Sequence, residues 1–169
     1  VAELAAALGR DPKDYLLELI GPPRLIDAGA MSDAWLYGED PKRYPFDTGR
    51  LRQVVEKAAG EAGWGRKLPQ GRGLGIAAHR SFVSYTAVVV EVAIGPKGEL
   101  TIPRVDVAFD CGAVVNPDRV RSQLEGAAVQ GISLATLGEI SFKNGRVQQT
   151  NFDGYELTRQ GKAAKALGV

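Results

Sequence analysis

Residues 116–138 read NPDRVRSQLEGAAVQGISLATLG, and this stretch predicts a long helix between two strand-rich segments. Asn116 can cap the amino end, and Pro117 suits the first turn, where its missing N–H would have no intrahelical acceptor. Gly138 can end the helix about six turns later. The pattern therefore predicts a helix over residues 117–137.

One face of this predicted helix combines two amides with small residues. Gln123 and Gln130 are seven residues apart, so they return to nearly the same face, roughly 10 Å apart along the axis. Gly126 and Ala127 lie between them, and Gly131 follows. Glycine costs about 1 kcal/mol relative to alanine inside a helix, so another body is expected to approach the backbone here. Either a neighbouring helix or strand packs on this face, or a flat polar ligand lies along it and bonds to both amides.

The composition limits the class of protein. The chain has 169 residues, 44% of them hydrophobic, so it is one domain or one piece of a larger one. Its formal net charge is +1, which gives no indication of a nucleic-acid partner. No apolar run is long enough to span a bilayer, and no signal-peptide pattern opens the chain. Cys111 is the only cysteine, so no intrachain disulfide can form.

Residues 1–66 predict helices on either side of an irregular insertion. Apolar residues recur at helical spacing near the start, and Asp11 can cap a second helix that begins at Pro12. Residues 50–62 predict a short amphipathic helix. Residues 21–50 are rich in Gly, Pro and aromatic residues without periodicity, and we interpret them as the insertion. Its aromatic side chains are expected to anchor packing: Trp35, Tyr37, Tyr44 and Phe46.

Strand signals dominate the second half of the chain. Residues 84–94 are strongly β-branched, residues 100–109 mostly alternate, and the turn between them completes a β-hairpin. Pro103 indicates an edge position or a bulge. Asn144-Gly145 predicts a second hairpin with a two-residue turn.

These elements predict an α+β fold of two layers. Hairpins in residues 67–160 would form a mixed or antiparallel sheet, followed by a tail over residues 161–169. The 117–137 helix and the N-terminal helices of residues 1–66 are expected to cover one side of this sheet.

Ordinary catalytic constellations are missing from the sequence. His79 is the only histidine and is expected to be a surface or hydrogen-bonded structural residue; with one cysteine, it makes no zinc site of the usual kind. The GRGLG run at residues 71–75 lacks the third glycine of a dinucleotide fingerprint, and it predicts a glycine-rich strand start. Three aspartates are too spread out to form a paired-carboxylate site: Asp106, Asp110 and Asp118.

Three segments carry a resemblance to a known family. They read GRGLGIAAHRSFVSYTAVVVEVAI from Gly71, RVDVAFDCGAVVNPDRVRSQLEGAAVQGISLATLGEI from Arg104, and GRVQQTNFDGYELTR from Gly145. The chain resembles the large, molybdopterin-binding subunits of the xanthine dehydrogenase and aldehyde oxidase family, and is similar to the bacterial isoquinoline 1-oxidoreductase beta subunits among them. This resemblance implies the molybdenum cofactor-binding domain fold.

The resemblance also implies a cofactor, a reaction and partners. In this family the glutamines of the QxEGxxxQG helix face molybdopterin cytosine dinucleotide or molybdopterin, and Gln123 and Gln130 occupy these positions, with Gly126 and Ala127 on the face between them. The implied reaction is hydroxylation of an aldehyde or N-heteroaromatic substrate, with water as oxygen source and a glutamate as base. Electrons would leave through [2Fe-2S] clusters on a small iron–sulfur subunit.

The family's catalytic glutamate lies in a downstream Gly-Glu loop that residues 1–169 do not include. We therefore expect the chain to be a fragment from the C-terminal part of a large subunit, inactive without the remainder of that subunit. Two alternatives are a non-catalytic protein–protein assembly module with this fold and a stand-alone small-molecule binder using the Gln123/Gln130 face. Similar beta subunits are commonly exported, which favours a periplasmic over a cytoplasmic location.

Overall fold

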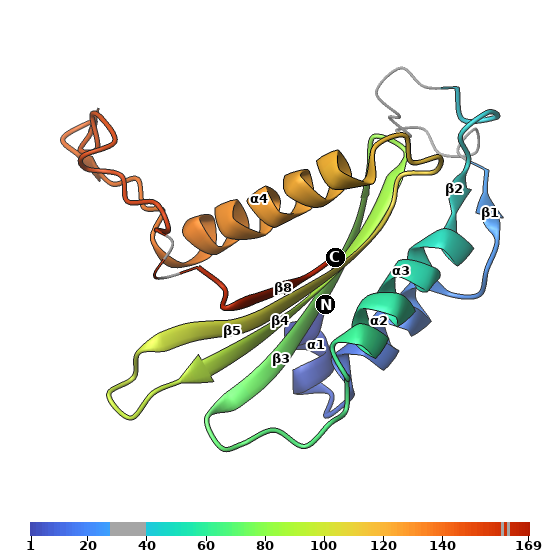
Figure 1. Cartoon of the computed structure of the whole chain (residues 1–169), viewed down its shortest axis with the longest axis horizontal. Helices are drawn as coiled ribbons and strands as arrows, with labels where there is room; N and C mark the ends of the chain where they lie inside the picture. The colour runs from blue at the N-terminus through green and yellow to red at the C-terminus, as the bar shows by residue number, and fades with distance from the viewer. Residues whose placement is uncertain (28–39, 160, 162) are drawn as a thin grey trace.

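The computed structural model of the chain describes residues 1–27, 40–159, 161 and 163–169. Its centre is a four-stranded sheet in the order β3-β4-β5-β8 (Figure 1). Three long antiparallel strands make most of it: β3 (Arg72–Ser81), β4 (Ser84–Ile94) and β5 (Leu100–Asp110). The short β8 (Ala166–Gly168) runs parallel to β5. The sheet is therefore mixed, and the predicted α+β class is confirmed.

The predicted hairpin of residues 84–94 and 100–109 forms β4 and β5, with an irregularity at the predicted proline. Glu91 is opposite Arg104, whereas Ala93 is opposite Thr101, so the ladder shifts register between these pairs. Pro103 lies inside the shifted stretch. Proline cannot donate a ladder hydrogen bond, and a bulge accommodates it without leaving an acceptor unpaired.

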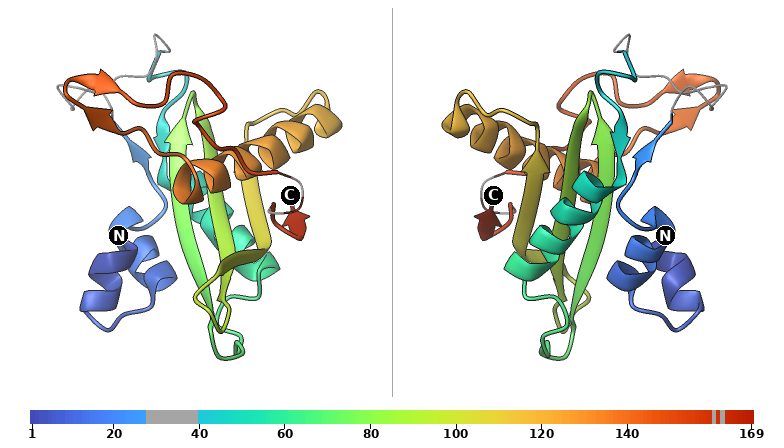
Figure 2. Two further views of the ribbon diagram at one scale, coloured as in Figure 1. Left: turned by 90° about the vertical axis from the view of Figure 1, so that its left-hand side faces the viewer. Right: turned by 90° about the vertical axis from the view of Figure 1, so that its right-hand side faces the viewer.

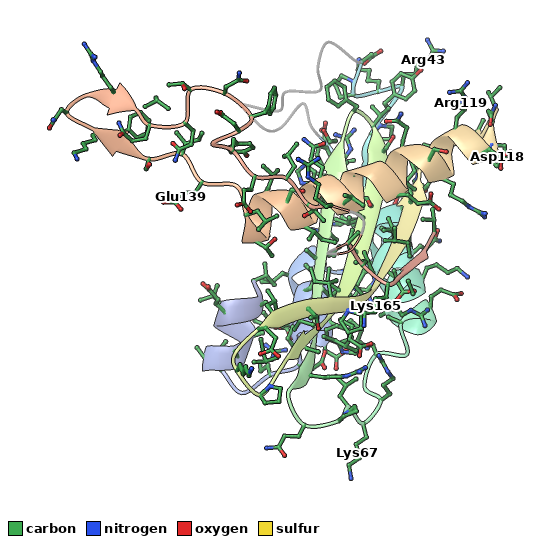
Figure 3. All side chains as sticks on the ribbon, turned by 60° about the vertical axis from the view of Figure 1, so that its left-hand side comes forward. Arg43, Lys67, Asp118, Arg119, Glu139 and Lys165 are labelled. Carbon is green, nitrogen blue, oxygen red and sulfur yellow. The ribbon has the colours of Figure 1, made fainter. Side chains whose placement is uncertain are left out.

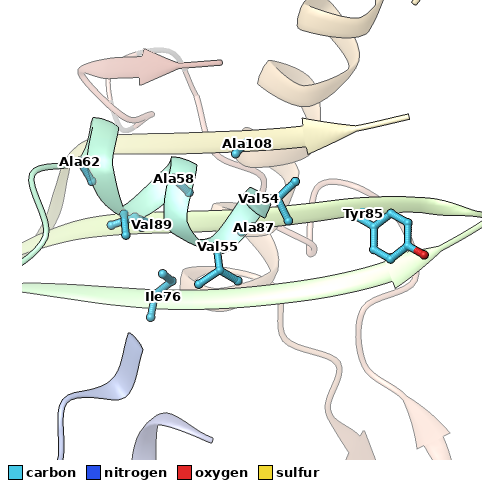
Figure 4. Close-up of a cluster of buried hydrophobic side chains, with 10 residues drawn as sticks. Val54, Val55, Ala58, Ala62, Ile76, Tyr85, Ala87, Val89 and Ala108 are labelled. Carbon is cyan, nitrogen blue, oxygen red and sulfur yellow. The ribbon is translucent and has the colours of Figure 1, made fainter. Parts of the chain in front are cut away.

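The main core lies between one face of the sheet and α3 (Thr48–Glu61). Asp47 caps this helix: its side chain accepts hydrogen bonds from the backbone N–H groups of Gly49 and Arg50. Figure 4 shows α3 lying across β3, β4 and β5. Five residues of this core are less than 2% exposed: Val55, Ala58, Tyr85, Ala87 and Val89.

The spacing of apolar residues correctly predicted two N-terminal helices, of which the second packs beside α3 and the first packs on the second. They are α1 (Ala2–Ala7) and α2 (Pro12–Ile20). The side chain of Asp11 caps α2 and also accepts a hydrogen bond of 2.9 Å from the indole N–H of Trp64. This contact fixes the start of α2 against the end of α3.

The long predicted helix is α4 (Pro117–Thr136), and it lies on the face of the sheet opposite α3 (Figure 2). Val88 and Val90 of β4 pack in an apolar cluster that includes Ile132 of α4. The alternate residues Ala87 and Val89 pack in the main core against α3. Successive side chains of a strand point to opposite faces. The expectation that α4 and the N-terminal helices cover one side is therefore wrong, because β4 is apolar on both faces and needs a helix on each.

Short ladders complete the described part of the fold. Within the expected insertion, β1 (Leu25–Ile26) pairs with β2 (Phe46–Asp47). The Asn144-Gly145 turn joins β6 (Phe142–Lys143) to β7 (Arg146–Val147), which confirms the predicted hairpin.

The aromatic residues of the insertion are only partly within the described residues. Tyr44 and Phe46 are half-buried, and the guanidinium of Arg80 lies 3.8 Å from the centre of the Phe46 ring. Both fit the expected packing role. Trp35 and Tyr37 lie outside the described residues.

Candidate functional site

The predicted site residues lie together on an exposed face of α4. Gln123, Gly126, Ala127 and Gln130 are all exposed. Within the described ranges, no hydrogen bond joins either glutamine amide to another residue. Each amide therefore keeps a carbonyl acceptor and an NH2 donor for a molecule that meets this face.

The opposite side of α4 holds the helix on the sheet. Ile132 is 8% exposed and packs in a cluster with Val105 and Val107 of β5. Leu124 and Ala128 contact the same cluster from earlier turns of the helix. This spacing of four residues fixes the rotation of α4 about its axis, and the rotation presents the amide face outward.

The start of α4 is fixed by a cap and by an ion pair from α3. The Asn116 side chain accepts a 3.0 Å hydrogen bond from the backbone N–H of Arg119. Upstream, Arg50 donates two hydrogen bonds of 2.6 Å to the carboxylate of Asp110, and the backbone N–H of Gly112 donates one of 2.9 Å. Asp110 thus ties α3 to the loop that leads into α4. Figure 3 shows Asp118 and Arg119 projecting outward beyond this point.

Sequence reasoning assigned no role to Asp110, because its partner is 60 residues away. The guanidinium of Arg50 lowers the pKa of the Asp110 carboxyl, and that carboxylate raises the pKa of Arg50. Both groups are therefore charged at neutral pH. The only local signal for this role is the position of Asp110 two residues before a glycine turn.

The glycines of α4 are not required by packing within the described residues. A Cβ atom added at Gly126 or Gly131 would meet nothing within 4 Å outside the helix's own nearby backbone. The sequence left open that another helix or strand approaches this face closely. No element in residues 1–27, 40–159, 161 or 163–169 does so at either glycine. Gly126 therefore leaves open space on the helix surface between the two amides, and Gly131 leaves open space just beyond Gln130.

An apolar groove borders this surface. It has a volume of about 490 Å³ and lies between α4 and the outer face of the sheet. Ala127 and Gly131 line it from the helix, while Val88, Val90 and Ile102 line it from the strands. The amide face can therefore bind polar heteroatoms, and the groove beside it can accept an apolar group.

The remaining candidate residues lie elsewhere. His79 is exposed on β3, and Cys111 is a partly exposed free thiol directly after β5. Among the residues that the structure describes, no three or more His, Cys, Asp or Glu side chains are grouped so that they could hold a metal ion. No helix in the same ranges has the length and apolar character to span a bilayer.

Comparison with known proteins places this architecture in a family. The model of the family described as "Molybdopterin cofactor-binding domain" matches residues 51–162, which include most of α3, the sheet from β3 to β5, and α4. The chain therefore belongs to the molybdopterin cofactor-binding domain family. This membership confirms the resemblance to the large subunits of the xanthine dehydrogenase and aldehyde oxidase family.

Individual relatives agree with this assignment. One subunit of the nicotinate dehydrogenase of Pseudomonas putida is 30% identical over 93% of the chain, and that match spans 13% of the relative. The beta subunit of the isoquinoline 1-oxidoreductase of Brevundimonas diminuta is 33% identical over 63% of the chain and 14% of the relative. A membrane-bound aldehyde dehydrogenase [pyrroloquinoline-quinone] of Gluconacetobacter polyoxogenes is 30% identical over 93% of the chain and 20% of the relative. The chain thus spans between about an eighth and a fifth of the length of these relatives.

Proposed function

We propose that the chain forms one wall of the molybdopterin site in the large subunit of a molybdenum hydroxylase. The observation that carries this proposal is the face of α4 that bears Gln123 and Gln130. Both amides are exposed and unpartnered within the described ranges, and the helix lies inside the region that matches the cofactor-binding family. A polar heterocycle with both donors and acceptors suits two such amides.

Each part of the face has a role in this proposal. Gln123 and Gln130 bind and orient the cofactor, while Gly126 and Ala127 let it approach the helix backbone closely. Asp110 and Arg50 hold the start of α4 in place. When bound, molybdopterin, as such or as its cytosine dinucleotide, would supply the molybdenum that hydroxylates the substrate with water as oxygen source. The glutamate base would come from another segment of the parent subunit, and the [2Fe-2S] clusters from a small partner subunit.

The proposed substrate is an aldehyde or an N-heteroaromatic compound. Two relatives are named for nicotinate and isoquinoline, and a third for an aldehyde. The name of the third relative also includes a quinone cofactor. Metal analysis of the parent protein distinguishes a molybdenum enzyme from a pyrroloquinoline-quinone enzyme, because the latter would not retain molybdenum with a pterin.

The substitution Gln123→Ala tests the proposed face directly. In the full-length parent subunit it should weaken cofactor retention by on the order of 1–3 kcal/mol, or about 5- to 150-fold, because a buried polar ligand loses one amide partner. Molybdenum is measured by elemental analysis, and pterin by the fluorescence of the released cofactor.

A matched control is Ser122→Ala. Ser122 is exposed on the same turn but points about 100° away from Gln123, so cofactor content should not change. Normal molybdenum and pterin content in the Gln123→Ala protein would contradict the assignment of Gln123 to the cofactor site. A parent protein that binds neither molybdenum nor pyrroloquinoline quinone would instead favour the non-catalytic assembly module.

A further inference from the structure

The outer edge of β5 is only half covered. β8 pairs with β5 over three residues, with Arg104 opposite Ala166, Val105 opposite Leu167 and Asp106 opposite Gly168. β5 then continues to Asp110, and no strand in the described part of the chain pairs with residues 107–110 on this side. Their outward backbone groups are strong donors and acceptors that lack a ladder partner.

A slot lies along this uncovered edge, in line with β8. It has a volume of about 590 Å³, and residues Gly168 and Val169 line its near end. Val54 and Lys57 of α3 line one side, and Val120 and Leu124 of α4 line the other. Figure 2 shows β8 beside the edge of β5, with α4 passing over it. A strand that continued the direction of β8 would therefore lie between two helices.

The two sides of the slot differ in chemistry. On the α4 side, Val107 and Leu124 belong to the apolar cluster that already holds Leu167 of β8, and Phe109 is 37% exposed. On the α3 side, Ala108 is small and Lys57 is polar, paired with Glu61 at 2.6 Å. Since side chains alternate between faces, a strand in this slot needs apolar residues toward α4 and tolerates polar residues toward α3.

We propose that a strand from the remainder of the parent subunit fills this slot, parallel to β5 and in line with β8. The inference rests on the proposed function, in which the chain works as part of a longer subunit, as its match to only 13–20% of the relatives' lengths suggests. A second copy of the chain fits poorly, because a two-fold pair would present the same edge twice and β8 already covers half of it.

Short tails appended to Val169 test this pairing in the full chain. In the register of β8, the first appended residue lies opposite Ala108 and the second opposite Phe109. A Thr-Val-Thr tail therefore directs its valine toward α4. A Val-Thr-Val tail directs its valines toward α3 and serves as the control of higher apolar content. A Thr-Asp-Thr tail places a charge against Phe109 and Leu124.

Amide hydrogen exchange at residues 107–110 is the measurement. The Thr-Val-Thr tail should slow exchange about ten-fold or more at the amides that face the slot, and it should raise the thermal midpoint. The other two tails should do neither. Equal protection from all three tails, or protection from none, would overturn the proposal.

This experiment requires neither molybdenum nor pterin, so it is independent of the cofactor assignment. If the tails have no selective effect while Gln123→Ala lowers molybdenum content, the strand inference fails and the proposed function stands. If only the Thr-Val-Thr tail protects the amides of residues 107–110 while the parent protein retains no molybdenum, the proposed function fails and the edge still accepts a strand.

Discussion

At the scale of single residues, α4 and α3 each contain an exposed glycine that their own packing does not require. A Cβ atom at Gly126 of α4 or at Gly60 of α3 would meet nothing within 4 Å. Only Gly126 lies between the two glutamines. Substitution at these two positions can therefore separate helix stability from contact with a ligand.

We expect Gly126→Leu to stabilise the isolated chain and to impair the parent subunit. The free energy of unfolding should rise by up to about 1 kcal/mol, because leucine has a better helix propensity than glycine. Cofactor content of the parent subunit should fall, because the side chain fills the surface that the pterin would approach. Urea denaturation and molybdenum analysis measure the two effects. Gly60→Leu is the control and should leave cofactor content unchanged; equal loading in both variants would place Gly126 outside the site.

The Arg50–Asp110 pair predicts a dependence of stability on pH. Because the pKa of Asp110 is lowered in the folded chain, the pair stabilises the fold fully above the unfolded pKa of about 4, and this contribution is lost as pH falls through the lower folded pKa. Asp110→Asn should therefore cost on the order of 1–2 kcal/mol at pH 7, a value that allows for the partial exposure of both groups.

The difference between Asp110→Asn and the original chain should shrink as pH falls below about 4, in urea titrations at several pH values. Glu56→Gln is the control, because Glu56 pairs with Arg52 at 3.4 Å and its side chain is 54% exposed. It should cost less than about 0.5 kcal/mol at any pH. A constant difference for Asp110→Asn across the pH range would mean that its carboxylate is not the group that matters.

At the scale of elements, two hairpins have the same kind of turn with very different sequences. Asn144 and Gly145 have φ values of 52° and 74° in the β6–β7 turn. Phe82 and Val83 have φ values of 46° and 60° in the β3–β4 turn. Positive φ is favourable for glycine and tolerated by asparagine, but a β-branched residue there is strained. The β3–β4 turn therefore forms against the backbone preference of its two central residues.

Val83→Gly should relieve this strain and raise the free energy of unfolding by about 1 kcal/mol. Thermal or urea denaturation measures the change. Gly145→Val is the reverse control, and it should destabilise the β6–β7 hairpin by a similar amount. A loss of stability in Val83→Gly would show that contacts of the half-buried valine side chain outweigh the backbone strain.

At the scale of the whole molecule, the two faces of the sheet are covered to different extents. α3 has five buried residues among 14, including Val54 and Val55, whereas α4 has only Ile132 and Ser133 among 20. The apolar groove beside α4 adds to this difference. The α4 face is thus the incomplete side of the fold, and it is also the side that carries the glutamines.

Native-state hydrogen exchange should reflect this asymmetry. Amides in α4 should exchange through openings of lower free energy than amides in the middle of α3, because fewer apolar contacts are lost when α4 detaches. In the cofactor-loaded parent subunit, α4 should become more protected. Equal protection of the two helices in the isolated chain would contradict this account of the incomplete face.

Local features of the fold were predictable from the sequence by itself. The Asn116 cap, the hairpin with its bulge at Pro103 and the Asn144-Gly145 turn each depend on neighbouring residues, and all are present in the structure. The shared face of Gln123 and Gln130 follows from helical spacing, and the structure leaves both exposed. Whether that face binds the cofactor stays a prediction.

Only the tertiary structure decided the arrangements that join distant residues. β4 is apolar on both faces, so its pattern could not assign α3 and α4 to opposite sides. The three-residue β8, in the segment expected to be a tail, is too short to show a strand period and forms by pairing with β5. Likewise, the Arg50–Asp110 pair closes a loop of 60 residues. Propensity and periodicity describe a residue's near neighbours, whereas these choices depend on which distant surfaces exclude water together.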